Sequence, residues 1–194
     1  MVVIILKQIE NRHPKIRRKL LAPFIININP NKVTFIALVC AFLSGYFFYT
    51  DYLVLAAIFL ALNGFLDVLD GEIAKKGKPT KRGDFLDHSF DRISDTAIFV
   101  GLAYNPVMPT ELTLMTLICV LLVSYLGTQA QALTDKRMYG GVMGRAERGI
   151  ILFAAAITTY LFMEVLVYSL YLIVILSVIT FLQRFYSLYR DLKD

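Results

Sequence analysis

The 194-residue chain contains no tryptophan and only two cysteines, Cys40 and Cys119. Both cysteines lie within apolar runs, and neither has another cysteine or a histidine at the spacing of a metal ligand. We therefore expect neither a disulfide nor a cysteine metal site. The first residues, 1–7, form an apolar run that is too short and wrongly flanked for a cleaved signal peptide.

Lysine and arginine are absent from three long stretches, residues 33–74, 93–135 and 149–183. The chain is 57% hydrophobic, with a mean hydropathy of +0.62, whereas soluble domains are about 45–50% apolar. This composition excludes an ordinary soluble domain. At about 20 residues a span, the chain has room for roughly six membrane helices and no separate soluble domain.

We therefore predict an all-α integral membrane protein with six transmembrane helices and an N-terminal interfacial amphipathic helix. The expected spans are residues 33–50, 53–75, 84–104, 110–135, 146–163 and 166–190. Each stretch without Lys or Arg matches one helical hairpin, and all 20 basic residues lie outside these stretches. The positive-inside rule then predicts a multi-pass protein of the cell membrane with both termini on the cytoplasmic side.

Residues 7–27 mix six basic side chains with Ile16, Leu20, Leu21 and Phe24. This mixture is typical of an amphipathic segment at the membrane interface, with its basic edge toward anionic headgroups. An ordinary positive flank of the first span is the alternative. We divide the chain into a cytoplasmic juxtamembrane segment, 1–31, and a six-helix membrane domain, 32–194.

Two carboxylate pairs lie at the cytoplasmic ends of the second and third expected spans. Asp67 and Asp70 are spaced i, i+3, and Asp87 and Asp91 are spaced i, i+4, so each pair shares one face of a helix. Four acidic groups at the edge of apolar helices are costly unless they are neutralised. Divalent cations with a preference for hard oxygen ligands would neutralise them. We interpret the stretch as a metal-dependent active site.

Basic residues near these pairs have two interpretations. The loop of residues 75–82 either lines a phosphate or is an ordinary positive-inside loop. Arg145, Arg148 and Arg184 either snorkel to the interface or converge on a phosphate, which a guanidinium binds bidentately. His88 points away from the face shared by Asp87 and Asp91, so we expect it to support the site or pack rather than bind metal.

The two acidic motifs resemble the signature of the CDP-alcohol phosphotransferase family, D-x2-D-G-x2-A-R followed by G-x3-D-x3-D. Seven positions match in order, namely Asp67, Asp70, Gly71, Ala74, Gly83, Asp87 and Asp91. Lys75 replaces the usual arginine, and the spacer before Gly83 is one residue shorter than in the family. The match covers about an eighth of the chain, and the six expected spans agree with the family's fold.

The resemblance implies a homodimeric membrane enzyme that transfers a phosphatidyl-type group from a CDP-linked lipid to an alcohol and releases CMP. It implies two divalent cations, Mg²⁺ or Mn²⁺, bound by Asp67, Asp70, Asp87 and Asp91, with Asp91 also the general base. The residues implied to bind the cytidine diphosphate are Asp70, Gly71, Ala74, Lys75, Thr80 and Gly83. The implied partners are the donor lipid, the acceptor, CMP and membrane lipids, and no nucleic acid is expected.

The acceptor is predicted from the arginines. The family's inositol-phosphate branch has a Lys and an Arg where this chain has Gly127 and Gln129, but the three arginines at positions 145, 148 and 184 persist. We expect a phosphorylated polyol bound by these three arginines, with glycerol phosphate favoured over inositol 1-phosphate. The chain looks most like archaeal members, which implies CDP-archaeol as the donor, with CDP-diacylglycerol as the other candidate.

Two other classes fit parts of the pattern. Intramembrane prenyltransferases also bind diphosphate through Asp and Mg²⁺, but their two acidic motifs are about half the protein apart, whereas Asp70 and Asp87 are separated by sixteen residues. A cation transporter would use the carboxylates as an ion path, but such sites usually lie near the membrane midplane in interrupted helices. Stabilisation by metal with CMP distinguishes the enzyme from the transporter.

Overall fold

The computed structural model describes residues 28–77, 80–134, 138, 140–159, 162 and 164–192. This part of the chain is all helical, without strands, and its six helices follow the predicted order closely. They are α3 (Pro30–Tyr49), α4 (Leu53–Lys76), α5 (Lys81–Ala103), α6 (Thr110–Thr134), α7 (Arg145–Thr158) and α8 (Val165–Asp191). The predicted amphipathic segment falls almost entirely on residues 1–27, outside the described part.

Four of the described helices, α3, α4, α6 and α8, are long and apolar enough to cross a membrane. The other two differ from the predicted spans for separate reasons. α5 carries Asp87, Asp91, Arg92 and Asp95 in its middle. α7 has 14 residues, a length of about 21 Å at 1.5 Å per residue, whereas the hydrocarbon core is about 30 Å thick. These two helices carry much of the polar site described below.

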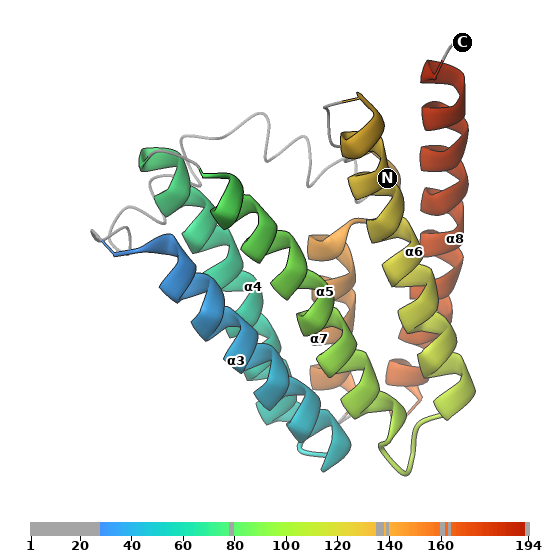
Figure 1. Ribbon diagram of the computed structural model, residues 1–194. Helices are drawn as coiled ribbons and strands as arrows, with labels where there is room; N and C mark the ends of the chain where they lie inside the picture. Colours follow the sequence, from blue (N-terminus) through green and yellow to red (C-terminus); the bar gives the residue numbers. More distant parts are fainter. Residues whose placement is uncertain are drawn as a thin grey trace.

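The bundle consists of two groups of helices joined through α5 and α7 (Figure 1). α3 packs against both α4 and α5, and α6 packs against α8 and α5. The short α7 lies between α4 and α8. Large apolar side chains such as Phe35, Phe42, Leu172 and Ile175 are exposed on the outside of the bundle, as expected for a surface that faces lipid rather than water.

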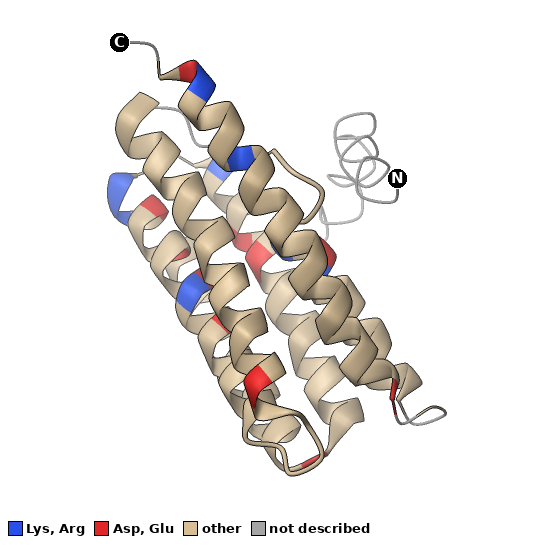
Figure 2. Ribbon diagram, turned by 90° about the vertical axis from the view of Figure 1, so that its right-hand side faces the viewer, with Lys and Arg blue, Asp and Glu red and all other residues tan. Residues whose placement is uncertain are grey.

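Charge is distributed unequally between the two ends of the bundle (Figure 2). The described Lys and Arg lie toward the end where α4 and α8 finish and α5 and α7 begin. The opposite end contains Asp51 and Glu164 in turns and Glu111 at the start of α6. The acidic motif at the end of α4 and the start of α5 therefore lies in the basic half of the molecule.

Two glycines set the spacing between α3 and α5. A Cβ added to Gly45 would overlap the main chain of Ala97, and one added to Gly101 would overlap the main chain of Gly45. The two backbones can therefore approach this closely only because both positions lack a side chain. This crossing holds α5, with its carboxylates, tightly against α3.

Candidate active site

Local capping determines where the two polar helices begin. Thr80 starts α5, and its hydroxyl oxygen accepts a hydrogen bond from the Gly83 backbone N–H at 3.1 Å. At the start of α7, the backbone N–H of Gly144 donates to the Glu147 carboxylate at 2.8 Å. This second cap places Arg145 at the first position of its helix.

Asp67 of α4 and Asp91 of α5 meet at a single guanidinium nitrogen. Arg145 Nη1 lies 2.5 Å from Asp67 Oδ1 and 2.8 Å from Asp91 Oδ1. The side chains of Asp67 and Asp91 are only 29% and 17% exposed, so these charge-assisted contacts are partly shielded from water. Arg145 therefore joins the two predicted carboxylate pairs.

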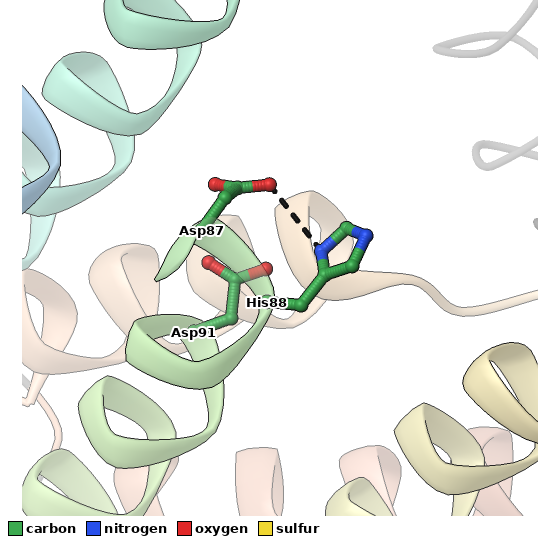
Figure 3. Close-up of side chains that lie close together, drawn as sticks. All are labelled: Asp87, His88 and Asp91. Atoms are coloured by element: carbon green, nitrogen blue, oxygen red, sulfur yellow. Dashed lines mark ion pairs between the residues drawn. The ribbon is translucent and has the colours of Figure 1, made fainter. Parts of the chain in front are cut away.

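Asp70 and Asp87 complete the group. Asp70 is only 4% exposed, and its Oδ2 is buried without a hydrogen-bond partner among the described residues. Its carboxylate interacts electrostatically with those of Asp67 and Asp87. Asp87 and Asp91 lie one turn apart on the same side of α5 (Figure 3). The structure thus brings the four predicted carboxylates together.

His88 lies beside the acidic group on α5 (Figure 3). Its Nδ1 is 3.3 Å from Asp87 Oδ2, and its Nε2 is 3.1 Å from Asp84 Oδ1. One possible ligand atom from each of Asp87, His88 and Asp91 also lies within 4.8 Å of the others. The imidazole thus contacts both Asp84 and Asp87, and it stands close enough to offer a nitrogen ligand. The supporting role of His88 stays a prediction.

Two polar residues of the site were missed from the sequence, Asn63 on α4 and Asp95 on α5. Asn63 Oδ1 accepts a hydrogen bond from Arg145 Nη2 at 3.4 Å, and Asn63 Nδ2 donates to the Ala37 carbonyl of α3 at 2.8 Å. Asp95 Oδ1 lies 3.9 Å from Arg145 Nε. Spacing could have found both, because each lies one helical turn further from the loop than Asp67 or Asp91.

Arg148 is the partner of Asp95. The guanidinium Nη2 forms a buried ion pair with Asp95 Oδ2, and the two residues are only 6% and 5% exposed. Arg145 and Arg148 lie one turn apart on α7, and both therefore face the acidic groups of α4 and α5. Two of the three arginines predicted to bind the acceptor phosphate belong to this site.

Arg184 of α8 makes different contacts. Its Nε donates to the Gly140 carbonyl at 2.7 Å, and its Nη1 donates to the Val123 carbonyl of α6 at 2.8 Å. The backbone N–H of Met143 in the same loop donates to Thr180 Oγ1 at 2.9 Å. These bonds fasten the loop before α7 to α6 and α8, and so help to place the first turn of α7.

The positions predicted for the nucleotide surround the junction of α4 and α5. Gly71 has open space where a side chain would project, and Ala74 lies in the last turn of α4. Lys75 Nζ pairs with Glu72 at 2.9 Å and is 67% exposed, and such an exposed pair is easily exchanged for another anion. Thr80 and Gly83 form the cap of α5 described above.

A cavity of about 340 Å³ adjoins the carboxylates. It lies between α4, α5 and α7, and its polar lining residues are Asn63, Asp67, Asp95, Arg145 and Arg148. Leu60, Ile98, Phe99, Leu152 and Phe153 form an apolar part of the wall. The cavity therefore combines two cationic groups and carboxylates at one place with an apolar continuation into the bundle.

Known proteins are similar to this chain in sequence and in fold. The model of the CDP-alcohol phosphatidyltransferase family matches residues 27–182. The chain is 39% identical over 169 residues to the archaetidylinositol phosphate synthase of Pyrococcus horikoshii, a match that covers 87% of each chain.

Solved structures of the phosphatidylinositol phosphate synthase of Mycobacterium tuberculosis have the same fold at 28% sequence identity. The structure with CDP-DAG bound superposes with a TM-score of 0.75, covering 90% of this chain and 92% of that one. The structure in complex with manganese and citrate gives 0.74, covering 90% of this chain and 88% of that one.

The site and these matches define a transferase of membrane lipid synthesis. The chain belongs to the CDP-alcohol phosphatidyltransferase family. The apolar helices are those of a multi-pass membrane protein.

Proposed function

We propose that the protein transfers an archaetidyl group from CDP-archaeol to inositol 1-phosphate, with release of CMP. The observation that carries the proposal is the placement of Arg145 and Arg148 in one cavity wall with Asp67 and Asp95. Arg145 also contacts Asp91, a second predicted metal ligand. A phosphorylated acceptor bound by the two arginines would have its hydroxyl near the carboxylates. The archaetidylinositol phosphate synthase of P. horikoshii supports this acceptor.

This proposal changes the order of the two acceptors. The sequence favoured glycerol phosphate because Gly127 and Gln129 replace two cationic residues. The relatives favour the inositol alternative instead, because they are an archaetidylinositol phosphate synthase and a phosphatidylinositol phosphate synthase. Guanidinium groups bind phosphate bidentately, and Arg145 and Arg148 supply two of them even without the two lost cations.

A divalent cation fits the residues of the site. The buried Oδ2 of Asp70 has no partner among the described residues, and all four aspartates offer the oxygen donors that Mg²⁺ and Mn²⁺ prefer. We propose that Asp67, Asp70, Asp87 and Asp91 hold two such ions. Bound there, the ions supply charge neutralisation for the diphosphate and for the departing CMP. The manganese complex of the mycobacterial synthase supports the assignment.

The remaining chemistry is carried by residues of this chain. Asp91 takes the proton of the attacking acceptor hydroxyl, whose oxygen bonds to the lipid-bearing phosphorus while the bond from that phosphorus to CMP breaks. Gly71, Ala74, Lys75, Thr80 and Gly83, together with Asp70, line the cytidine diphosphate. Arg145 and Arg148 hold the acceptor phosphate, and positioning of two substrates at this interface supplies much of the rate.

Arg184 was predicted to bind the same phosphate. Its bonds to the carbonyls of Gly140 and Val123 support a second role, in which it holds the loop that places Arg145. Direct contact with the phosphate stays a prediction, and the Arg184→Ala variant tests both roles.

We propose the full topology on the same basis. The distribution of Lys and Arg supports six membrane helices with the active site and both termini in the cytoplasm. In this arrangement α5 and α7 span together with the four longer helices, and residues 1–31 lie at the cytoplasmic membrane surface. The family resemblance supports a homodimer.

The test is CMP release from CDP-archaeol by the purified protein in the presence of Mg²⁺ or Mn²⁺. Inositol 1-phosphate, glycerol 1-phosphate, serine and free inositol are offered one at a time, and CDP-diacylglycerol replaces the donor in a parallel series. We expect turnover with inositol 1-phosphate and at least tenfold less with the others. Turnover with glycerol 1-phosphate alone would restore the first acceptor prediction, and turnover with serine alone would refute a phosphorylated acceptor.

A further inference from the structure

The guanidinium of Arg145 contacts the site along two different edges. Nη1 bonds both Asp67 and Asp91, at 2.5 and 2.8 Å. Nη2 and Nε face Asn63 and Asp95, at 3.4 and 3.9 Å. The first edge thus contacts two of the proposed metal ligands. The second edge donates a hydrogen bond to Asn63 and lies near Asp95, two residues outside the proposed metal set.

The two residues that face the second edge, Asn63 and Asp95, are positioned by contacts that do not involve Arg145. Asn63 is 4% exposed and donates through Nδ2 to the Ala37 carbonyl of α3. Asp95 is 5% exposed and forms the buried ion pair with Arg148. Both residues therefore keep their positions when the Nη1 contacts of Arg145 are broken.

The first edge competes with a metal ion. The Nη1 group of Arg145 contacts Asp67 Oδ1 and Asp91 Oδ1. A divalent cation bound by the same two oxygens would stand close to the guanidinium and repel its positive charge. The ion carries two positive charges against one for the guanidinium, so it has the stronger attraction for the clustered carboxylates. Metal binding would therefore release Nη1 from Asp67 and Asp91.

We infer that Arg145 is an exchangeable counter-ion of the carboxylate site. In the metal-free protein it neutralises Asp67 and Asp91 and holds α4 and α5 together. When metal binds, Nη1 is released, while Asp95 and Asn63 retain the other edge at the cavity wall. The freed donor then binds a phosphate in the cavity. This inference rests on the proposed metal site and adds a coupling between metal and acceptor that the proposed reaction alone does not require.

The expected coupling between metal and phosphate is positive. Arg145 opposes metal binding when no phosphate is present, because its bonds to Asp67 and Asp91 must be broken first. A phosphate that binds the released guanidinium stabilises the metal-bound arrangement. Metal and phosphate should therefore increase each other's affinity by the same factor, since such coupling is reciprocal.

The test measures Mn²⁺ binding to the full-length protein in detergent, from the electron paramagnetic resonance signal of free Mn²⁺, with and without inorganic phosphate. In the wild type we expect phosphate to tighten Mn²⁺ binding about fivefold or more. Arg145→Gln should bind Mn²⁺ about fivefold or more tighter than wild type without phosphate, and phosphate should then have no effect. Arg190→Gln is the matched control, because it removes the same charge from an exposed pair with Asp191 on α8, and it should behave as wild type.

Asp95→Asn provides a second test in which Arg145 itself is unchanged. Because Asp95 also neutralises the buried Arg148, Mn²⁺ binding of this variant is measured on protein that is shown to be folded. The Asn side chain keeps the shape at this position but loses the charge that retains the guanidinium. Its Mn²⁺ binding should persist, while the effect of phosphate falls at least threefold.

Each remaining outcome decides the matter. The exchange is wrong, although the metal site stands, if phosphate leaves Mn²⁺ binding to the wild type unchanged. The same conclusion follows if Arg145→Gln binds Mn²⁺ with wild-type or weaker affinity, or if Asp95→Asn keeps the full phosphate effect. If the wild type binds no Mn²⁺, both the proposed metal site and the exchange are refuted.

Discussion

Asp95 of α5 and Arg148 of α7 form an ion pair that is buried at both ends. Asp95 lies one helical turn beyond Asp91, and Arg148 lies one turn beyond Arg145. The pair therefore lies one helical turn further into the bundle than the contact between Asp91 and Arg145. Through it, α7 is fastened to α5 without any use of the four proposed metal ligands.

Removing one partner of this pair should destabilise the fold strongly. Asp95→Ala would leave the Arg148 guanidinium buried without its carboxylate, a loss of about 3–5 kcal/mol. Thermal unfolding of the protein in detergent should show a clearly lower midpoint. As a control, Asp191→Ala breaks the exposed pair with Arg190, which is worth about 0–1 kcal/mol. Equal midpoints for Asp95→Ala and the control would contradict the importance of burial here.

The close crossing of α3 and α5 gives a second stability prediction. Gly101→Ala places a methyl group on the main chain of Gly45, and overpacking of this kind costs about 1–3 kcal/mol. Gly64→Ala is the matched control, because a Cβ at Gly64 meets no atom within 4 Å. We expect a lower unfolding midpoint for Gly101→Ala only. A wild-type midpoint for this variant would mean that the two helices are further apart than described.

Metal should stabilise the folded protein through Asp70. The buried Oδ2 of this residue has no partner among the described residues, so a bound cation would satisfy it. At a metal concentration 100 times the dissociation constant, the expected stabilisation is about 2.7 kcal/mol. Chelation with EDTA should reverse the rise in unfolding midpoint. Asp70→Asn should lose this metal-dependent rise, whereas Asp84→Asn, on the more exposed Asp84 of α5, should keep it. A full rise in the Asp70 variant would remove Asp70 from the ligand set.

The Arg184→Ala variant tests how the loop before α7 affects binding of the acceptor. Arg184→Ala removes the bonds to the carbonyls of Gly140 and Val123, and it removes any direct contact with the phosphate. Either role predicts a higher KM for the acceptor with little change in the KM for the donor lipid. A lower unfolding midpoint in addition would indicate the loop-fastening role, and an unchanged midpoint would indicate direct binding. An unchanged acceptor KM would contradict both roles.

The sequence was most informative where spacing alone determines position. The i, i+3 and i, i+4 pairs of Asp placed four carboxylates on two helix faces, and the stretches without Lys or Arg located six helices. The structure confirms that these elements meet. α7 begins at Arg145, as expected, but ends at Thr158, so it is shorter than the predicted span of 146–163.

The parts that could not be predicted depend on contacts between distant segments. Asn63 gains its role from Arg145, which lies 82 residues later in the chain, and Asp95 from Arg148, which lies 53 residues later. Arg184 bonds to backbone carbonyls, which every residue possesses, so no sequence pattern marks its partners. The close approach at Gly45 and Gly101 likewise appears only when α3 and α5 are packed.

The central claim is that the clustered aspartates catalyse a metal-dependent transfer with release of CMP. The most direct measurement compares CMP release from CDP-archaeol and inositol 1-phosphate by wild type, Asp87→Asn and Asp84→Asn at saturating Mn²⁺. Asp84 and Asp87 lie on the same helix and both contact His88, but only Asp87 belongs to the proposed metal ligands. We predict activity in wild type and Asp84→Asn and a loss of at least about 100-fold in Asp87→Asn, comparable to removal of other essential polar groups. Wild-type activity in a folded Asp87→Asn protein would contradict the account.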